Sequence, residues 1–317
     1  MGDRKGVGPE VTVRALADAG LRRLSGLAVV GDLETIKCAA ELARVSLPIT
    51  RFDPDRFCGQ DGAFLRRDAI NVIDLGKRGD SGDPLRYIDC AVSLIQKKMA
   101  SAVVTAPVNK EAISRSGVRF VGHTEYIAGL TRTAKYAMMF VAGTLKVTLV
   151  TRHIPLKDVG KAVTKAKIKD AISLTHDFLR DRMNIKKPVI GVCALNPHAG
   201  EGGLIGTEEI NVIIPAIKSA ERALGNIKGP IPADSAFGLL AKGRVDCLIS
   251  MYHDQAMIPL KTIAREECVN VTLGLPFIRT SPAHGTAYDI AWKGIADPSS
   301  MKAAVRLAIE LTRRGRF

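Results

Sequence analysis

The chain alternates short apolar runs with longer amphipathic segments. The apolar runs predict strands at 27–31, 71–75, 101–107, 135–142, 145–151, 188–195, 245–251 and 269–275. Apolar positions three or four residues apart predict helices at 33–42, 86–99, 165–183, 207–224 and 299–314. This alternation predicts an α/β fold with a largely parallel sheet. The runs on either side of Gly143 and Thr144 predict an antiparallel hairpin, which indicates a second sub-domain.

The chain begins with a glycine loop, residues 2–8, followed by a helix with Pro9 and Glu10 in its first turn. Such a loop can hold a phosphate. A strand normally feeds a loop of this kind, and none precedes it in the sequence. We therefore expect either a trimmed chain start or a sheet that lacks an edge strand.

A second glycine-rich stretch, residues 195–203, follows the apolar run at 188–195. Pro197 keeps Asn196 extended, and three glycines then allow a sharp turn. His198 is therefore presented at the carboxyl end of a strand, where open α/β sheets bind their ligands. Glu201 is either a partner of this histidine or a solvent-facing charge.

Composition indicates a globular protein. The 317 residues are 46% hydrophobic, and no apolar run approaches the roughly 20 residues of a membrane span. Charged residues from Asp3 onward interrupt any signal-peptide pattern. The cysteines form no Cys-x-x-Cys pair, as is typical of reduced thiols: Cys38, Cys58, Cys90, Cys193, Cys247 and Cys268. We expect a cytoplasmic protein with no membrane partner.

The net charge of +14 favours an anionic partner. Nucleic acid is one candidate, but aromatic residues make up only 5% and no basic stretch is interleaved with them. The basic residues are spread along the whole chain. We therefore expect an anionic small molecule rather than a nucleic acid.

Three histidines, His153, His198 and His253, each follow a predicted strand directly. Neutral imidazoles in this number suit a divalent metal such as zinc or cobalt, with positions left open for substrate. Their spacing alone leaves a second interpretation open, in which each is a separately hydrogen-bonded polar residue. His176 instead lies on the apolar face of its helix and is expected in the core.

Other polar residues lie near the same predicted strand ends. Lys261, Asn270 and Arg279 would together suit a phosphate or a carboxylate, although each alone is more often a surface residue. Asp234 and Asp254 are candidates for a general base or for orienting the histidines. Asp234 could equally cap a helix after Pro232.

The small-residue loop 283–291 contains His284, Gly285 and Asp289. It could receive the adenosine end of a nucleotide, with Asp289 on a ribose hydroxyl. The chain has neither a Gly-x-Gly-x-x-Gly motif after a strand nor a phosphate-binding Gly-Lys-Ser/Thr loop.

Several specific motifs run nearly from end to end: Gly2-Asp3, 6–10, 105–110, 122–125, 196–203, 206–209, 252–255, 271–280 and 284–286. Together they resemble the 4-hydroxythreonine-4-phosphate dehydrogenases of pyridoxal phosphate biosynthesis. The stretch 284–291, with 293–298, separately resembles the nucleotide loop of isopropylmalate and isocitrate dehydrogenases, whose fold that family shares. Arg4 and Lys5 depart from the family, which has Pro-Ala there, and the strand that normally precedes them is absent.

The resemblance implies two α/β sub-domains with a cleft between them. We expect a discontinuous nucleotide-side sub-domain at 1–111 plus 264–317, and a central one at 112–263 with the metal ligands and dimer contacts. The implied site residues are His153, His198 and His253 for the metal (zinc, cobalt or magnesium), His123, Thr124, Lys261, Asn270 and Arg279 for the substrate, and His284, Gly285 and Asp289 for the nucleotide. The resemblance also implies a homodimer whose metal site is built from both subunits.

The implied reaction is the NAD- or NADP-dependent oxidation of a phosphorylated 3-hydroxy acid. The expected substrate is 4-phosphohydroxy-L-threonine, whose oxidation product loses CO₂ to give 3-amino-2-oxopropyl phosphate. The sister branch, which oxidises 4-phospho-D-threonate or 4-phospho-D-erythronate, is the alternative, because residues 105–112, 136–138 and 286–292 also resemble it. Asp254, Asp234 or a bound water would be the base. A metallohydrolase is a more remote alternative.

Overall fold

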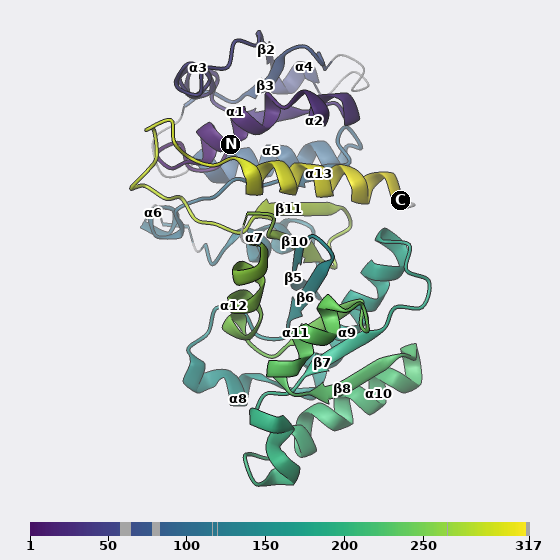
Figure 1. Ribbon diagram of the computed structural model, residues 1–317. Helices are drawn as coiled ribbons and strands as arrows, with labels where there is room; N and C mark the ends of the chain where they lie inside the picture. The colour runs from purple at the N-terminus through teal and green to yellow at the C-terminus, as the bar shows by residue number, and fades with distance from the viewer. Residues whose placement is uncertain (58–64, 78–82, 116, 119, 265, 315–317) are drawn as a thin grey trace. The chain divides into compact units, whose positions relative to one another are not determined.

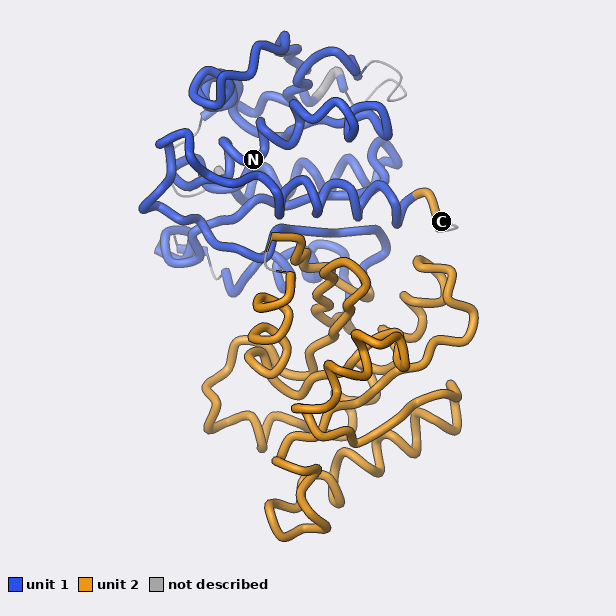
Figure 2. The backbone as a smooth tube through the Cα atoms, in the orientation of Figure 1, with its two compact units in different colours: residues 1–133, 275–312 blue, residues 134–274, 313–317 orange. Residues whose placement is uncertain are grey.

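The computed structural model describes residues 1–57, 65–77, 83–115, 117–118, 120–264 and 266–314. The chain divides into two compact units, which are shown in different colours in Figure 2. Unit 1 comprises residues 1–133 and 275–312, and unit 2 comprises 134–274 and 313–317. Unit 1 is discontinuous, as the predicted nucleotide-side sub-domain is, but it ends later, at 133 rather than 111, and resumes later, at 275 rather than 264.

Unit 1 alternates helices and short strands (Figure 1). Its strands are β1 (Ala28–Gly31), β2 (Ile49–Phe52), β3 (Ile70–Asp74), β4 (Ala102–Val104) and β11 (Ile278–Pro282). Its helices are α1 (Gly8–Leu16), α2 (Ala19–Leu24), α3 (Leu33–Leu42), α4 (Pro54–Phe57), α5 (Asp83–Gln96), α6 (Lys110–Arg115), α7 (His123–Leu130) and α13 (Ser299–Arg314).

The strands of unit 1 pair in parallel. β3 lies between β1 and β2, and β4 pairs with β11. Helix α5 contacts both β1 and β4. Helices α1 and α13 share an apolar cluster that includes Val11, Ala15, Met301 and Val305. The amphipathic helices predicted from spacing therefore bury their apolar sides against these strands.

Unit 2 is built on β5 (Ala137–Ala142), β6 (Leu145–Leu149), β7 (Ile190–Cys193), β8 (Ile227–Ile231), β9 (Cys247–Ser250) and β10 (Val269–Leu273). Its helices are α8 (Val159–Ala162), α9 (Lys165–Arg182), α10 (Ile214–Leu224), α11 (Ala233–Ala241) and α12 (His253–Ala264). Shorter turns are η2 (Leu156–Asp158), η3 (Pro197–Gly203) and η4 (Glu209–Ile213), the last a π-helical turn.

The strands of unit 2 follow the order β10-β5-β6-β9-β7-β8. The β5–β6 hairpin is antiparallel, as predicted, and β5 is also antiparallel to β10. The remaining pairs, β6–β9, β9–β7 and β7–β8, are parallel. The prediction of an α/β fold with a largely parallel sheet is therefore confirmed.

Three local features were not predicted from the sequence. Residues 227–231 form strand β8 around Pro230. Proline is tolerated there because β8 lies at the end of the strand order, where one edge needs no donor. Arg279 lies within β11, a strand that the hydrophobic pattern did not predict. α7 begins at His123, so Thr124 lies buried in its first turn.

The cysteines are consistent with buried thiols where the sequence places them in strands. Burial raises the pKa of Cys193 and of Cys247 to about 12, so both thiols stay protonated at neutral pH. Cys58 lies outside the described residues. No helix in the described part of the chain is both long enough and apolar enough to cross a membrane.

Candidate active site

The strand order of unit 2 explains why two histidines meet. β6 and β9 are parallel neighbours, so their carboxyl ends lie at the same edge of the sheet. Backbone pairing continues past both strands, from Val150 N to Ser250 O (2.9 Å) and from Thr151 N to Met251 O (3.1 Å). His153 and His253 follow directly, and their ring centroids lie 5.3 Å apart.

This separation fits two ligands of one metal ion. A zinc–nitrogen distance of about 2.0–2.1 Å puts each ring centroid about 3.2 Å from the ion, and a tetrahedral angle then separates the centroids by about 5.2 Å. The observed 5.3 Å agrees with this value. The two imidazoles could therefore share a metal ion with little movement.

A carboxylate orients one ring of the pair. Asp254 Oδ1 lies 2.7 Å from His253 Nδ1. With the proton on Nδ1, this contact leaves the Nε2 lone pair for a metal, which is the usual arrangement of a metal-binding histidine. Gln255 fixes the start of α12 by accepting from Met251 N (2.7 Å) and donating to Ala194 O (2.8 Å).

His198 has the same kind of partner but lies elsewhere. Glu201 Oε1 is 2.6 Å from His198 Nδ1 and raises the pKa of the imidazole, with a smaller contribution from Asp234. Glu201 is thus a partner of the histidine rather than a plain surface charge. Among the residues that the structure describes, no group of three His, Cys, Asp or Glu side chains could hold a metal. Within one chain, the structure therefore brings together His153 and His253 and leaves His198 apart.

The reason is the backbone of η3. Residues 198–202 all have positive φ, between 42° and 80°, so the chain makes a left-handed turn directly after β7. Three of them, His198, Ala199 and Glu201, are not glycine, and each costs about 1–2 kcal/mol in this conformation. The turn presents His198 to solvent, with 67% of its side chain exposed.

A buried carboxylate stabilises the base of this turn. Glu209 Oε1 accepts hydrogen bonds from Leu195 N and Asn196 N, both 2.8 Å, and its Oε2 accepts one from Asn196 Nδ2, also 2.8 Å. Glu209 is 1% exposed. Glu208 also accepts from Asn196 Nδ2, which lowers the pKa of Glu208. Glu209 therefore positions the turn that carries His198.

A second cluster, in unit 1, centres on Arg279. This guanidinium is 2% exposed and donates through Nε to Thr105 Oγ1 (3.2 Å) and through Nη1 to Thr124 Oγ1 (3.5 Å). Burial lowers its pKa to about 10, so it stays charged at neutral pH. A buried guanidinium of this kind suits an anionic ligand.

His123 borders this cation. Burial lowers the pKa of His123 well below its ordinary value, and the charges of Arg279 and Lys110 add to the effect. The imidazole is therefore neutral near pH 7 and can accept or donate a hydrogen bond.

The remaining predicted substrate residues, Lys261 and Asn270, belong to unit 2. Lys261 is exposed on α12. Asn270 lies in β10 and is 9% exposed, and its Oδ1 has no hydrogen-bond partner among the described residues. A buried amide oxygen without a partner is costly, so a ligand donor at this position would stabilise it.

The predicted nucleotide loop packs against the N-terminal glycine loop. Val7 N donates to Thr286 O (2.9 Å), and Tyr288 Oη donates to Asp3. A Cβ on Gly6 would lie 2.8 Å from Thr286 O, so a side chain there would separate the two loops. His284 Nδ1 lies 3.0 Å from Gly285 O, and Asp289 is exposed.

A cavity of about 360 Å³ adjoins these loops, with Asp3, Asn109 and Tyr288 among its lining residues. Lys5, one of the two departures from the family pattern, also lines it. Arg4 keeps a backbone role, because Arg4 O accepts from Trp292 Nε1 (2.9 Å).

Comparison with known proteins agrees with this description. Residues 24–308 match the family model of the pyridoxal phosphate biosynthetic protein PdxA. The chain belongs to the PdxA family. It is 40% identical over 319 residues to 4-hydroxythreonine-4-phosphate dehydrogenase of Sulfurihydrogenibium sp., covering 99% of this chain and 97% of the relative. It is 41% identical over 326 residues to D-threonate 4-phosphate dehydrogenase of Cupriavidus necator, covering 99% and 96%.

A solved PdxA-family structure shares the fold. The crystal structure of 4-hydroxythreonine-4-phosphate dehydrogenase from Klebsiella pneumoniae has a TM-score of 0.85 and 36% identity, and the match covers 98% of this chain and 96% of that one. Membership of the PdxA family, predicted from the motifs, is therefore confirmed.

In this PdxA-family chain, sequence reasoning missed Glu209 and Thr105 as site residues. Both lie inside stretches that carry the family resemblance, and Thr105 is the polar end of an apolar strand. Their roles come from contacts with Asn196 and Arg279, which lie 13 and 174 residues away along the chain. The only local signal for either residue was the polar Thr105 at the end of an apolar run, two positions before Pro107.

Proposed function

We propose that this protein is a dehydrogenase that uses NAD or NADP and a divalent metal to oxidise the 3-hydroxyl group of a 4-phosphorylated 3-hydroxy acid. The first candidate substrate is 4-phosphohydroxy-L-threonine, whose 3-oxo product is a β-keto acid and loses CO₂. The observation that carries this proposal is the His153–His253 pair, with ring centroids 5.3 Å apart, in a PdxA-family chain.

A divalent metal would supply stabilisation of the negative charge that develops on the C3 oxygen, and the nicotinamide nucleotide would accept the hydride. His153 and His253 would hold the metal, with Asp254 keeping the His253 ring in place. Zinc, cobalt and magnesium are all candidates, and the two imidazoles favour zinc or cobalt over magnesium.

The third imidazole of the proposed site comes from a second copy of the chain. His198 is exposed and already oriented by Glu201, so its Nε2 is available to another molecule. A homodimer in which His198 of one subunit joins the His153–His253 pair of the other would complete a three-histidine site. A chain measured as a monomer with full activity would refute this arrangement.

Buried polar groups would bind the rest of the substrate. Arg279 would bind one anionic end through the planar fork of its guanidinium, with Thr105 and Thr124 fixing its orientation. Asn270 would donate or accept at the substrate backbone, and Lys261 would supply a further charge. Binding energy at these remote groups positions the reacting carbon.

The proton of the C3 hydroxyl needs an acceptor. Asp254 and Asp234 are both exposed carboxylates near the histidines, but Asp254 is engaged with His253. Asp234 accepts only from Ser235 N among its described hydrogen bonds (2.9 Å). We therefore assign Asp254 to orienting the metal ligand, and Asp234 or a water to proton removal.

Residues 283–291 and the glycine loop would hold the nucleotide. Their mutual contacts and the adjoining cavity support a ligand position there, with Asp289 exposed to receive a ribose hydroxyl. His284 and Gly285 would line the approach to this nucleotide position. Lys5 at the cavity would favour a phosphate group.

The 41% identity to a D-threonate 4-phosphate dehydrogenase favours 4-phospho-D-threonate or 4-phospho-D-erythronate as the alternative substrate. The test is a parallel assay of the three phosphorylated acids with NAD and NADP, read as absorbance of the reduced nucleotide. The substrate with the highest kcat/KM identifies the branch. Release of inorganic phosphate without nucleotide reduction would overturn the dehydrogenase proposal in favour of a hydrolase.

The metal proposal has its own test. His253→Ala should lose bound metal and turnover while keeping its far-ultraviolet circular dichroism, because the imidazole removed is half-exposed. His176→Gln is the matched control, since His176 lies on α9 with Asp177 as its hydrogen-bond partner. Full metal content in His253→Ala would refute the assignment.

A further inference from the structure

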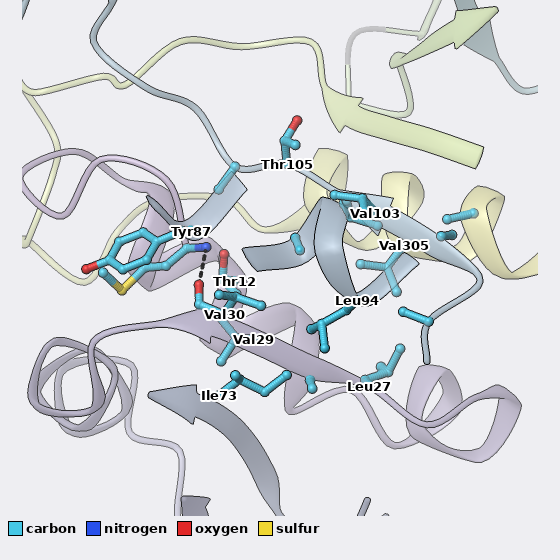
Figure 3. A pocket seen from close by; sticks show the side chains of 18 of the residues that line it. Thr12, Leu27, Val29, Val30, Ile73, Tyr87, Leu94, Val103, Thr105 and Val305 are labelled. Carbon is cyan, nitrogen blue, oxygen red and sulfur yellow. Dashed lines mark hydrogen bonds between the residues drawn. The ribbon is translucent and has the colours of Figure 1, made fainter. Parts of the chain in front are cut away.

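Two cavities of unit 1 differ in the chemistry of their walls. The larger, of about 390 Å³, is bounded mainly by apolar side chains such as Val29, Leu94 and Val305 (Figure 3), and none of its described lining residues is Lys, Arg, Asp or Glu. The smaller, of about 360 Å³, adjoins the glycine loop, and Lys5 is the only Lys or Arg among the described residues that line it. Of the two, the smaller cavity therefore suits an anionic group.

The backbone on each side of Lys5 is fixed to the predicted nucleotide loop or to the residue directly after it. On one side, Arg4 O accepts a hydrogen bond from Trp292 Nε1 (2.9 Å). On the other side, Val7 N donates to Thr286 O (2.9 Å). Because its neighbours are held near the two ends of the loop, Lys5 lies opposite the middle of the loop.

A tight turn keeps the main chain of Lys5 in this position. Asp3 Oδ1 accepts from Lys5 N (2.9 Å), and Asp3 O accepts from Gly6 N (3.2 Å). The other carboxylate oxygen of Asp3 accepts from Tyr288 Oη. Both carboxylate oxygens of Asp3 therefore already accept hydrogen bonds, whereas the side chain of Lys5 is exposed. The backbone of Lys5 is fixed, but its flexible stem lets the ammonium move to a ligand.

We propose that Lys5 binds the 2′-phosphate of NADP and that this chain therefore prefers NADP to NAD. The inference rests on the proposed use of a nicotinamide nucleotide, whose adenosine ribose Asp289 would receive. Asp289 would then hold the 3′-hydroxyl, and the 2′-phosphate would enter the cavity beside Lys5 and Tyr288. Lys5 is one of the two departures from the family pattern, so this preference would be particular to the present chain.

The groups around this position favour a phosphate over a hydroxyl. In dinucleotide sites an acidic residue accepts the ribose hydroxyl of NAD, and a basic residue accommodates the 2′-phosphate of NADP. Asp289 opposes the phosphate, but it is exposed, so solvent screens its charge. Lys293 is exposed in the same turn as Asp289 and adds a second cation. Asn109 also lines the cavity, and its Oδ1 accepts from Ala112 N (2.9 Å), so its amide nitrogen is the group that can donate to a phosphate.

The test is calorimetric titration with two nucleotide fragments that differ only in the 2′-phosphate, adenosine 2′,5′-bisphosphate and adenosine 5′-monophosphate. We expect the unsubstituted protein to bind the bisphosphate at least about tenfold more tightly, because the added contact joins two charged groups. Lys5→Ala should reduce this difference to about threefold or less, and Lys5→Arg, which keeps the charge, should retain it. The ratio of kcat/KM for NADP to that for NAD should fall in Lys5→Ala in the same way.

Lys37→Ala is the matched control, because Lys37 is an exposed lysine of α3 that pairs with Glu34 and does not line the cavity. It should bind both fragments as the unsubstituted protein does. Equal binding of the two fragments by the unsubstituted protein, or an undiminished difference in Lys5→Ala, would overturn the role of Lys5 and leave the dehydrogenase proposal intact. Binding of neither fragment would instead overturn the proposed nucleotide position, and this inference with it.

Discussion

Glu209 is the residue whose loss should most clearly loosen the turn that carries His198. Its carboxylate accepts three hydrogen bonds of 2.8 Å at a position that is 1% exposed. Hydrogen bonds to charged groups contribute about 1.5–3 kcal/mol each, which gives roughly 4–9 kcal/mol for three. The three non-glycine residues in left-handed conformation oppose this with roughly 3–6 kcal/mol. The hydrogen bonds to Glu209 therefore stabilise the turn by about as much as its left-handed residues destabilise it, so the turn depends on this carboxylate.

Glu209→Gln keeps the shape of the side chain but changes its chemistry. The remaining oxygen can still accept from Leu195 N and Asn196 N, with about half the strength once the charge is gone. The new amide group would face Asn196 Nδ2, and two donors cannot bond. Flipping the Asn196 amide would only turn its oxygen toward Glu208. We expect a local loss of about 2 kcal/mol, which corresponds to roughly 30-fold faster exchange.

The assay is hydrogen–deuterium exchange of a peptide covering residues 195–203. Glu208→Gln is the matched control, because Glu208 bonds to the same Asn196 amide but holds no backbone N–H of Leu195 or Asn196 in the described hydrogen bonds. The control should exchange no more than about threefold faster than the parent. Equal exchange in the two variants, or unchanged exchange in Glu209→Gln, would refute the assignment of Glu209 as a positioning residue.

Three further predictions concern other parts of the molecule. The Met1 amino group has a pKa of about 5 in the folded chain and about 8 in the unfolded chain, so between these pH values it binds its proton mainly in the unfolded state. The free energy of unfolding should therefore rise by up to about 4 kcal/mol from pH 5 to pH 8. N-terminal acetylation should remove this part of the pH dependence, and an acetylated protein with the same profile would contradict the prediction. Gly206→Ala should lower the free energy of unfolding by about 3 kcal/mol, because the new Cβ would lie 2.5 Å from Asn196 Nδ2. Gly202→Ala is the control: its Cβ would meet open space, so it should cost only about 1 kcal/mol for its positive φ. Equal denaturation midpoints for the two variants would show that the contact with Asn196 is unimportant. Arg279→Lys should raise KM for the phosphorylated substrate at least tenfold, because an ammonium cannot reproduce the planar fork that Thr105 and Thr124 hold. Thr312→Ser, at a residue outside these contacts, is the control in steady-state kinetics. An unchanged KM in Arg279→Lys would remove Arg279 from the substrate site.

The local hydrophobic pattern was sufficient to predict those elements whose sequence is strongly periodic. The amphipathic helix predicted at 165–183 appears as α9 at Lys165–Arg182, and His176 is 8% exposed, as expected for a core residue. The hairpin across Gly143 and Thr144 is also present. In both places the residues that determine the structure are close together in the chain, so their spacing carries the information.

Strand β8 shows where local pattern failed. Gly229 and Pro230 are poor strand formers, and only the free edge beyond β8 in the strand order allows them to occupy a strand. Arg279 shows the same limitation for the site. No strand was predicted around Arg279, yet β11 pairs with β4 and brings the guanidinium to Thr105.

The amino-acid sequence by itself determined the α/β class, the family and the residue types available for chemistry, because these depend on periodicity and on short contiguous motifs. Only the tertiary structure decided which of those residues meet. Three histidines follow three strands, but the pairing of β6 with β9 joins His153 to His253, while the left-handed turn after β7 carries His198 away. That turn depends on Glu209, whose partner Asn196 lies 13 residues away along the chain. Such contacts are set by packing between distant segments, which no local pattern records.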